Sequence, residues 1–342
     1  MNRPTLIPGL PRLWRGPGEL QLGSDPARAL LLRLPDPKAA RVLDLLDGTR
    51  SERLIVIRAI QLGVLAEDCL ALLETLQDAG LALPSAALVP PALGADSRHR
   101  LTGEAAALVL RGHNRTPAQT LRRRLAARVV LTGRGRLGAP IAVALAEAGV
   151  GHVRPEVTGE VGPGELAGGP LRASDVGRPR RAAITDALFR AAPGTTHDVR
   201  RMAASLLIQL DHDEPAGLRA ATLANHHQPH LAVTIREGAA VIGPLVPARG
   251  APCLNCLELH RLERDASWPG VPTRAGPIAE PCAVTTVLAA TAYAVAESLT
   301  FLDGGAPETL GATVEITAPG RVRRRSWPPH PECGCSGRVD AP

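Results

Sequence analysis

The sequence predicts an α/β protein with a doubly wound sheet, a small α+β module before the sheet and a tethered tail after it. Three observations support this prediction. A β-branched run, Arg128–Thr132, leads into a glycine-rich loop at 133–138 and then a helix-forming segment at 139–148. Four cysteines form two close pairs that are far apart in the chain. Before residue 91, short strand patterns are followed by amphipathic helix patterns, which is typical of a separate small unit.

The composition excludes several classes of protein. The 342 residues suffice for two domains, and a core with only 2% aromatic residues must be built from Leu, Val, Ala and Ile. The formal charge of +6 is almost all arginine, since Lys38 is the only lysine. These arginines are scattered without interleaved aromatic residues, so no nucleic-acid partner is expected. Charged residues interrupt the apolar runs, so no membrane-spanning segment is expected either.

Residues 1–90 predict a winged-helix-like module. Leucines at alternating positions within 20–34 indicate short strands, and helical patterns follow at 39–46, from Ser51 and from Ala66. The third helix carries four acidic side chains that would repel DNA phosphates: Glu67, Asp68, Glu74 and Asp78. A peptide or protein partner, added along an exposed strand edge, is therefore expected instead.

A linker and a larger domain are expected after this module. Residues 85–102 are rich in Pro, Ala and Gly. We therefore expect the linker over 91–120 and the main domain over 121–342.

The main domain opens with the motif of a Rossmann-like nucleotide fold. Gly133, Gly135 and Gly138 have the Gly-x-Gly-x-x-Gly spacing between a strand and a helix. Such glycines allow a tight turn and close backbone approach, while the helix N-terminus offers N–H groups to phosphate. Any tight turn between strand and helix also favours glycine, so this pattern predicts the fold more firmly than nucleotide binding.

Acidic residues follow two of the predicted strands. Glu156, at the end of the second strand, is the candidate for binding ribose hydroxyls, although Pro155 and the following glycines obscure its position. Asp211 and Asp213 follow a buried-looking strand at 204–210. Carboxylates at such a strand end could hold Mg²⁺, and the alternative is a solvated helix cap.

The two cysteine pairs predict a structural zinc site. Cys253 and Cys256 have the spacing of a zinc knuckle, and Cys333 and Cys335 flank a single glycine. Four thiolates suit a closed tetrahedral Zn²⁺ site, which would tie the tail to the body of the domain. A disulfide and free thiols are the alternatives. The N-terminal residues do not resemble a secretory signal, so a cytoplasmic, reducing location is expected, which disfavours disulfides.

These features together resemble the superfamily of ubiquitin-activating-enzyme-like adenylyltransferases, which includes the ThiF-like sulfur-carrier activators. The resemblance spans about Leu125 to Gly337 and is carried by the glycine loop, Ser174–Arg180, the strand before Asp211, Gly243–Val246 leading into Pro252–Leu257, and the second cysteine pair. It is closest to the branch found beside azole-forming peptide cyclodehydratases. There, an N-terminal domain holds the leader peptide of a precursor. Leu46–Arg50 and Arg261–Pro269 look like that branch.

The resemblance implies a set of roles. Active members bind ATP with Mg²⁺ and adenylate the C-terminal carboxylate of a small protein. By resemblance, the backbone at Gly133, Gly135 and Gly138 approaches the phosphates, Arg180 or Arg181 is the basic residue, and Asp211 or Asp213 holds the metal. The family's Asn-Leu-x-Arg-Gln segment is absent between Gly159 and Gly169. Loss of a charge-stabilising donor such as that arginine typically costs about 2.7–4 kcal/mol in the transition state.

Two other features have ordinary structural interpretations. Cys282 lies between the cysteine pairs, where active family members place a nucleophilic cysteine, but its apolar neighbours favour a buried thiol. The histidines at 226, 227 and 230 precede a buried strand at a turn, which favours a hydrated loop over a metal site.

Two functions from different classes follow. The first is a binding protein that captures a small protein or precursor peptide and presents it to a partner modifying enzyme, with weakened or lost ATP chemistry. The alternative is an active adenylyltransferase that uses ATP and Mg²⁺. A nicotinamide oxidoreductase shares the glycine motif but leaves the cysteine pairs without a role. The resemblance also implies a homodimer.

Overall fold

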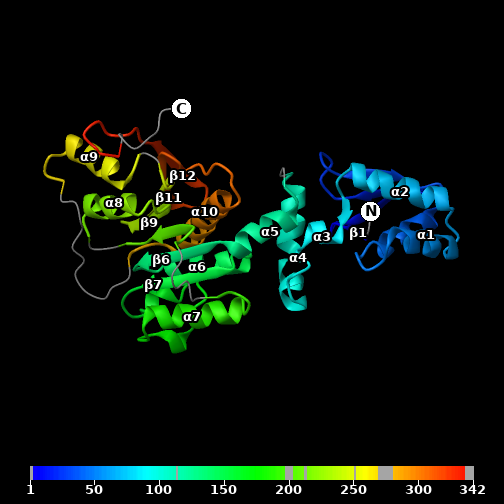
Figure 1. Ribbon diagram of the computed structural model, residues 1–342, viewed down its shortest axis with the longest axis horizontal. Coiled ribbons are helices and arrows are strands. Elements are labelled where there is room, and N and C mark those ends of the chain that lie inside the picture. Colours follow the sequence, from blue (N-terminus) through cyan, green and yellow to red (C-terminus); the bar gives the residue numbers. More distant parts are fainter. Residues whose placement is uncertain are drawn as a thin grey trace. The chain divides into compact units, whose positions relative to one another are not determined.

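The computed structural model describes residues 3–112, 115–196, 203–211, 214–249, 252–268 and 280–335. The chain divides into two compact units, Met1–Arg122 and Arg123–Pro342. Each is described by itself below, and Figure 1 labels many of their elements. The division falls within helix α5 (Pro117–Ala126).

The first unit contains two small antiparallel sheets and a group of helices. One sheet pairs β1 (Pro4–Leu6) with β5 (Ala82–Pro84), and the other has the order β2 (Arg12–Gly16), β3 (Glu19–Leu22) and β4 (Leu30–Arg33). A 3₁₀ helix η1 (Pro37–Leu45), α1 (Glu52–Gln61) and α2 (Ala66–Asp78) follow. The predicted strands and all three predicted helices are therefore present.

Local sequence signals explain where these helices begin. The Ser51 hydroxyl accepts a hydrogen bond from the backbone N–H of Leu54 and caps α1.

Buried leucines at alternate positions of β3, Leu20 and Leu22, pack with Leu72, Leu73 and Leu76 of α2 in one core. This shared core makes the module a folded unit.

The segment expected to be a linker is largely helical. Helix α3 (Ser85–Leu88) precedes it, and helix α4 (Ala95–Leu110) with the start of α5 occupies most of it. Leu101 and Leu108 of α4 are buried with Leu88 and Leu121 in a small separate core. Proline and alanine near residue 90 indicated an irregular segment, but the apolar residues further along give α4 a face to bury.

The second unit is built on a seven-stranded mixed sheet. Its order is β12 (Arg321–Ser326), β11 (Ala312–Ala318), β10 (Ala239–Val246), β9 (His230–Arg236), β8 (Leu206–Gln209), β6 (Arg128–Gly133) and β7 (His152–Val157). The strands from β7 to β9 pair in parallel, and those from β9 to β12 pair antiparallel. The expected α/β fold class is confirmed. The turn at Glu237 and Gly238 joins β9 to β10 as a hairpin.

Helices cover this sheet. α6 (Gly138–Glu147), α7 (Arg180–Ala191) and α10 (Val284–Leu302) share one large core with the inward strand residues. α8 (Ala216–Asn225) and α9 (Leu254–Arg264) pack against each other. Short 3₁₀ turns η2 (Pro163–Glu165) and η3 (Ala173–Asp175) connect β7 to α7.

Helix α10 corrects one expectation from the sequence. By length and composition alone it is apolar enough to cross a membrane, with a mean hydropathy of 1.3 over its most apolar window. Nevertheless Val287, Ala290 and Ala294 are buried in the core formed with the sheet. A buried core helix of a globular domain can have the same length and hydropathy as a membrane-spanning helix, and α10 is packed in the core of the second unit.

Candidate functional site

The glycine loop and Asp211 lie together at the point where the strand order reverses. The chain runs from β6 to β7 on one side and later places β8 on the other side of β6. At the carboxyl ends of β6 and β8, the backbone N–H of Arg134 donates to the carbonyl of Asp211 over 2.8 Å. Ligands of open α/β sheets bind in the crevice at such a switch point.

The three glycines of the loop have different physical roles. A Cβ at Gly133 would lie 2.6 Å from the Asp211 carbonyl oxygen, and a Cβ at Gly138 would lie 2.9 Å from a methyl carbon of Leu210. Gly133 is therefore required by the backbone that follows β8, whereas a Cβ at Gly138 would require the Leu210 side chain to shift. Gly135 differs, because the atoms nearest to its missing Cβ belong to the carboxylate of Glu280.

Asp211 is surrounded by polar groups from neighbouring elements. Its carboxylate accepts a hydrogen bond from the hydroxyl of Thr234 on β9, and it attracts the guanidinium of Arg236 at the end of the same strand. An aspartate at this strand end offers the oxygen ligands that Mg²⁺ prefers. Asp213, the other candidate, lies outside the described residues.

Helix α9 adds charged residues that sequence reasoning did not assign to the site. Arg261 donates to Glu258 over 3.2 Å, and the indole N–H of Trp268 donates to the same carboxylate over 2.9 Å. The Arg261 guanidinium also lies 5.5 Å from the centre of the Trp268 ring. Both Glu258 and Arg261 interact electrostatically with Arg236. Their order along one helical turn, three residues apart, is the signal that could have indicated them.

Arg180, a candidate basic residue, is held by contacts within its own region. Its Nε donates to Oε2 of Glu165 over 2.9 Å, and its Nη2 donates to Oε1 over 2.7 Å. The same guanidinium donates to the carbonyls of Thr158 and Glu160. The side chain of Arg181, the other candidate, is exposed on α7.

The segment Ser174–Arg180, singled out by the resemblance, also forms an internal network. The carboxylate of Asp175 accepts from the backbone N–H of Arg172 over 2.9 Å and from Arg178 over 2.7 Å. Arg178 also donates to Asp186 over 2.6 Å. The hydrogen bond from Arg172 is the largest contribution that holds the pKa of Asp175 below its usual value. These contacts fix the loop before α7.

Glu156 lies near the carboxyl end of β7, in register with Thr132 of β6. Its half-exposed side chain forms an ion pair with Arg154, two residues earlier on the same strand. This is the region where a ribose-binding acid is expected, but the carboxylate already has a basic partner.

Two residues were not predicted as part of the site: Arg136, within the glycine loop, and Glu280, beside it. Arg136, only 8% exposed, donates through Nη1 to the carbonyl of Cys282 over 3.0 Å. Glu280 places its carboxylate over Gly135. The Cys282 thiol is 3.6 Å from the Gly238 carbonyl, and burial raises its pKa. A raised pKa disfavours the thiolate that a nucleophile requires.

The four paired cysteines meet, as predicted. Their sulfur atoms lie within 4.8 Å of one another, and three of the four residues are buried. The separations are 3.9 Å for Cys253 and Cys256, 3.6 Å for Cys253 and Cys333, and 3.2 Å for Cys256 and Cys335. Four thiolates about 2.3 Å from a tetrahedral Zn²⁺ would be about 3.8 Å apart, so the donor set and spacing fit zinc.

Hydrogen bonds favour negative charge on one sulfur of the cluster, that of Cys256, whereas the pKa of Cys253 is raised by its hydrogen bond with Cys256 and the pKa of Cys335 is raised to about 11 by burial. The pKa of Cys256 is lowered to about 4, chiefly by the Cys253 thiol and also by the backbone N–H of His330. The side-chain amide of Asn255 donates to the Cys333 sulfur over 3.4 Å. Such outer contacts orient metal-binding thiolates.

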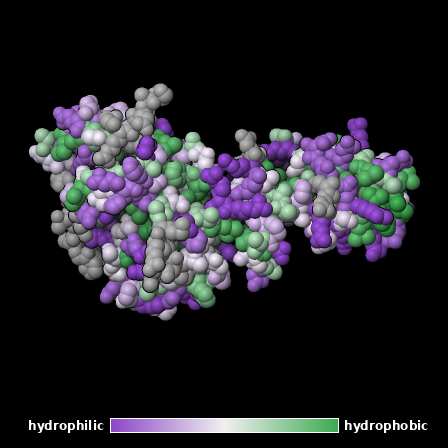
Figure 2. Space-filling model, viewed as in Figure 1, coloured by the Kyte–Doolittle hydropathy of each residue, from purple (hydrophilic) through white to green (hydrophobic). Residues whose placement is uncertain are grey.

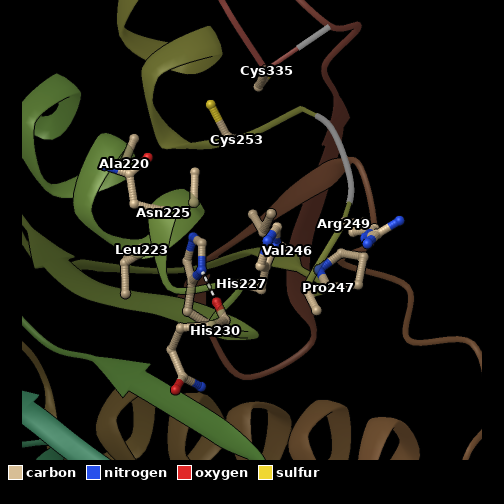
Figure 3. A pocket seen from close by; sticks show the side chains of 13 residues that line it. Ala220, Leu223, Asn225, His227, His230, Val246, Pro247, Arg249, Cys253 and Cys335 are labelled. Carbon is tan, nitrogen blue, oxygen red and sulfur yellow. Dashed lines mark hydrogen bonds between the residues drawn. The ribbon is translucent and has the colours of Figure 1, made fainter. Parts of the chain in front are cut away.

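A cavity of about 420 Å³ lies beside this cluster, between α8 and the end of β10 (Figure 3). Cys253 and Cys335 line it together with His227, His230 and Arg249. The expectation of a hydrated loop fits the exposed His226 and His227. It is wrong for His230, which is 3% exposed because it begins β9 and shares a hydrogen bond of 2.9 Å with the Gln228 carbonyl.

Comparisons with known proteins identify the fold. No protein-family model matches the sequence, and no curated protein matches it. Structures of Escherichia coli MccB do match. MccB with MccA-N7isoASN is 16% identical, over 98% of this chain and 100% of that chain, with a TM-score of 0.63. MccB with ATP is 15% identical over 97% and 99%, with a TM-score of 0.62.

A second protein shares this architecture. The selenomethionine form of PaaA is 14% identical over 93% of this chain and 98% of that chain, with a TM-score of 0.63. At these identities the likeness establishes the fold, and it does so for nearly the whole chain, including the N-terminal module. MccB itself is described as a microcin C7 biosynthetic enzyme and is also solved with N-formylated MccA.

Proposed function

We propose that this protein binds a small protein or precursor peptide through its N-terminal module and presents it to a partner modifying enzyme, with weakened or lost ATP chemistry. The observation that carries the second part is the state of Arg180. Its Nε, Nη1 and Nη2 all donate to Glu165 or to backbone carbonyls. A guanidinium committed in this way has little capacity left for transferring phosphates, and the family's other arginine is absent from the sequence.

The first unit supplies two surfaces for partners. β2 and β4 are the edge strands of its three-stranded sheet, and an extended peptide can add to such an edge through backbone hydrogen bonds. Leu13 and Trp14 on β2 are 44% and 52% exposed, so apolar side chains of a peptide would find contacts there. The likeness to MccB, which is solved with MccA, supports this assignment.

The second surface is on α1. Leu54, Ile57 and Ile60, spaced three residues apart, are all more than a third exposed, and Figure 2 shows hydrophobic residues gathered over the α1 and α2 end of this unit. Exposed apolar patches of this kind mark contacts with other proteins. The proposal assigns this patch to the modifying enzyme. It also includes a homodimer and a cytoplasmic location.

The cysteine cluster has a structural role in this proposal. Four sulfur ligands leave no open coordination position for a substrate, so Zn²⁺ would hold the tail containing Cys333 and Cys335 against α9.

The alternative function is an ATP- and Mg²⁺-dependent adenylyltransferase. Asp211 and the glycine loop lie together at the switch point of the sheet, which favours this alternative. MccB is also solved with ATP. In that case Asp211 would hold the metal and the loop would hold the phosphates.

Two measurements on one preparation test both functions. Binding of fluorescently labelled candidate peptides from neighbouring genes is measured by anisotropy, and ATP–pyrophosphate exchange is measured with the same peptides. We expect peptide binding that Trp14→Ala weakens at least about tenfold and the α1 control Ile60→Ala leaves unchanged. We expect no exchange above background. Peptide-dependent exchange would establish the alternative, and equal loss in both variants would contradict the edge-strand site.

A further inference from the structure

The glycine loop already holds an anionic group from its own chain. A Cβ placed on Gly135 would lie 3.1 Å from Oε1 of Glu280 and 3.6 Å from Oε2. The backbone of Gly135 has φ +108°, a conformation that L side chains rarely adopt. The carboxylate of Glu280 therefore lies against Gly135, at the position that a side chain of residue 135 would occupy. Unlike Gly133 and Gly138, Gly135 is not packed against the end of β8.

This position is the one that a phosphate takes in nucleotide-binding loops of this spacing. The second glycine of the Gly-x-Gly-x-x-Gly motif lets the backbone approach a pyrophosphate closely. Helix α6 begins at Gly138, immediately after the loop, and the partial positive charge of its N-terminus attracts anions. Glu280 supplies the negative charge for this site, in place of a phosphate.

Arg136 anchors the segment that carries Glu280. Its Nη1 donates to the Cys282 carbonyl over 3.0 Å and lies 3.5 Å from the Glu280 carbonyl oxygen. Among the described residues, its buried Nε has no hydrogen-bond partner. A buried guanidinium that binds two carbonyls two residues apart fixes the backbone on both sides of Pro281, and this holds the Glu280 side chain near the loop.

We propose that Glu280 is an internal competitor for the phosphate position of the glycine loop, so that a nucleoside triphosphate binds only when this carboxylate leaves. A carboxylate and a phosphate cannot both occupy this position of the loop, since like charges a few ångströms apart repel strongly where water is partly excluded. The inference rests on the proposed function, because it gives the weakened ATP chemistry a physical cause that is separate from the commitment of Arg180.

The test compares nucleotide affinity in charge variants at this residue. Binding of ATP with Mg²⁺, and of pyrophosphate alone, is measured by isothermal titration calorimetry on the full chain. Glu280→Gln removes the charge, and Glu280→Ala removes the charge and the bulk. Glu237→Gln, in the exposed turn between β9 and β10, is the matched control. Thermal unfolding of each variant verifies that it is folded.

The expected result is a Kd for ATP that falls at least about tenfold in both Glu280 variants and stays the same in the control. The Kd for pyrophosphate should fall by the same factor, because Glu280 competes for the phosphate position. An unchanged Kd, or no measurable binding by wild type and variants alike, would overturn the inference. Peptide binding measured in the same samples tests the proposed function separately. The proposed peptide site is on β2 in the first unit, whereas Glu280 belongs to the second unit.

Discussion

Arg180 and Glu165 form a two-bonded ion pair in which neither side chain is more than 12% exposed. Glu165 also caps the turn η2, because its Oε1 accepts from the backbone N–H of Gly162 over 2.9 Å. The pair thus joins the start of α7 to the loop that follows β7. Arg180, which the resemblance implies to be the basic residue of the site, is bound here by Glu165 and by the carbonyls of Thr158 and Glu160.

The first prediction concerns the stability that this pair contributes. Arg180→Ala leaves the buried Glu165 carboxylate without its partner, which typically costs about 3–5 kcal/mol. The neighbouring Arg181→Ala, on the exposed side of α7, should change the free energy of unfolding by no more than about 0.5 kcal/mol. Urea denaturation of both variants measures the difference. Equal, small losses would contradict a structural role for Arg180.

The second prediction concerns acid stability. The pKa of Asp175 is lower in the folded protein than its ordinary value of 3.8, chiefly because of the hydrogen bond from Arg172 and also because of Arg178. Its charged form therefore stabilises the fold at neutral pH, and this contribution is lost as the pH falls below about 4. Asp175→Asn should have a lower free energy of unfolding than wild type at pH 7, and this difference in free energy should be smaller at pH 3.

Asp186→Asn is the matched control for this prediction. Asp186 pairs with the same Arg178 but is half exposed, so it should contribute little. Urea denaturation at both pH values measures the effect. A gap between wild type and Asp175→Asn that does not narrow on acidification would refute the assignment.

The third prediction concerns the metal. We expect about one zinc per chain by elemental analysis, and its loss when Cys333 and Cys335 are both changed to Ser. The same double variant should melt at a lower temperature, because binding of a structural metal is coupled to folding. Cys282→Ser, which lies outside the cluster, should keep both the zinc and the melting temperature. The site would be disproved if the wild type contained no zinc and melted at the same temperature as the double variant.

The fourth prediction concerns the reactivity of Cys282. Because burial raises its pKa above the ordinary 9.0, little thiolate is present at pH 7. Alkylation by iodoacetamide, followed by mass spectrometry of the peptide that contains Cys282, should be slower than that of glutathione and should speed up above pH 9. Reaction at pH 7 as fast as glutathione would identify an activated nucleophile.

Much of the fold followed from short-range patterns. The β-branched run before Gly133 and the alanine-rich helix after Gly138 are local signals, and β6 and α6 form where they indicate. The residues near 90 were harder to interpret, since α4 is stabilised by burying Leu101 and Leu108 rather than by its local composition. Its partner Leu121 belongs to α5, more than ten residues further along the chain.

The candidate site shows the same division more sharply. Spacing alone paired Cys253 with Cys256 and Cys333 with Cys335, but only the packing of the tail on α9 brings the pairs together. Arg136 occupies a variable position of the glycine motif, and Glu280 belongs to no motif. Their relationship arises because the segment before α10 passes the start of α6, at a sequence separation of more than one hundred residues.

By itself, the sequence determined the strand, glycine turn and helix at 128–148, the helices α1 and α2, and the chemical character of the ligands that its cysteines provide. Those properties depend on neighbours within a few residues, where backbone preference and side-chain period act directly. Only the tertiary structure decided which charges meet: Glu165 with Arg180, and the Glu280 carboxylate with the bare backbone of Gly135. Electrostatic partners are set by distance in space, and the fold, not the spacing along the chain, sets that distance.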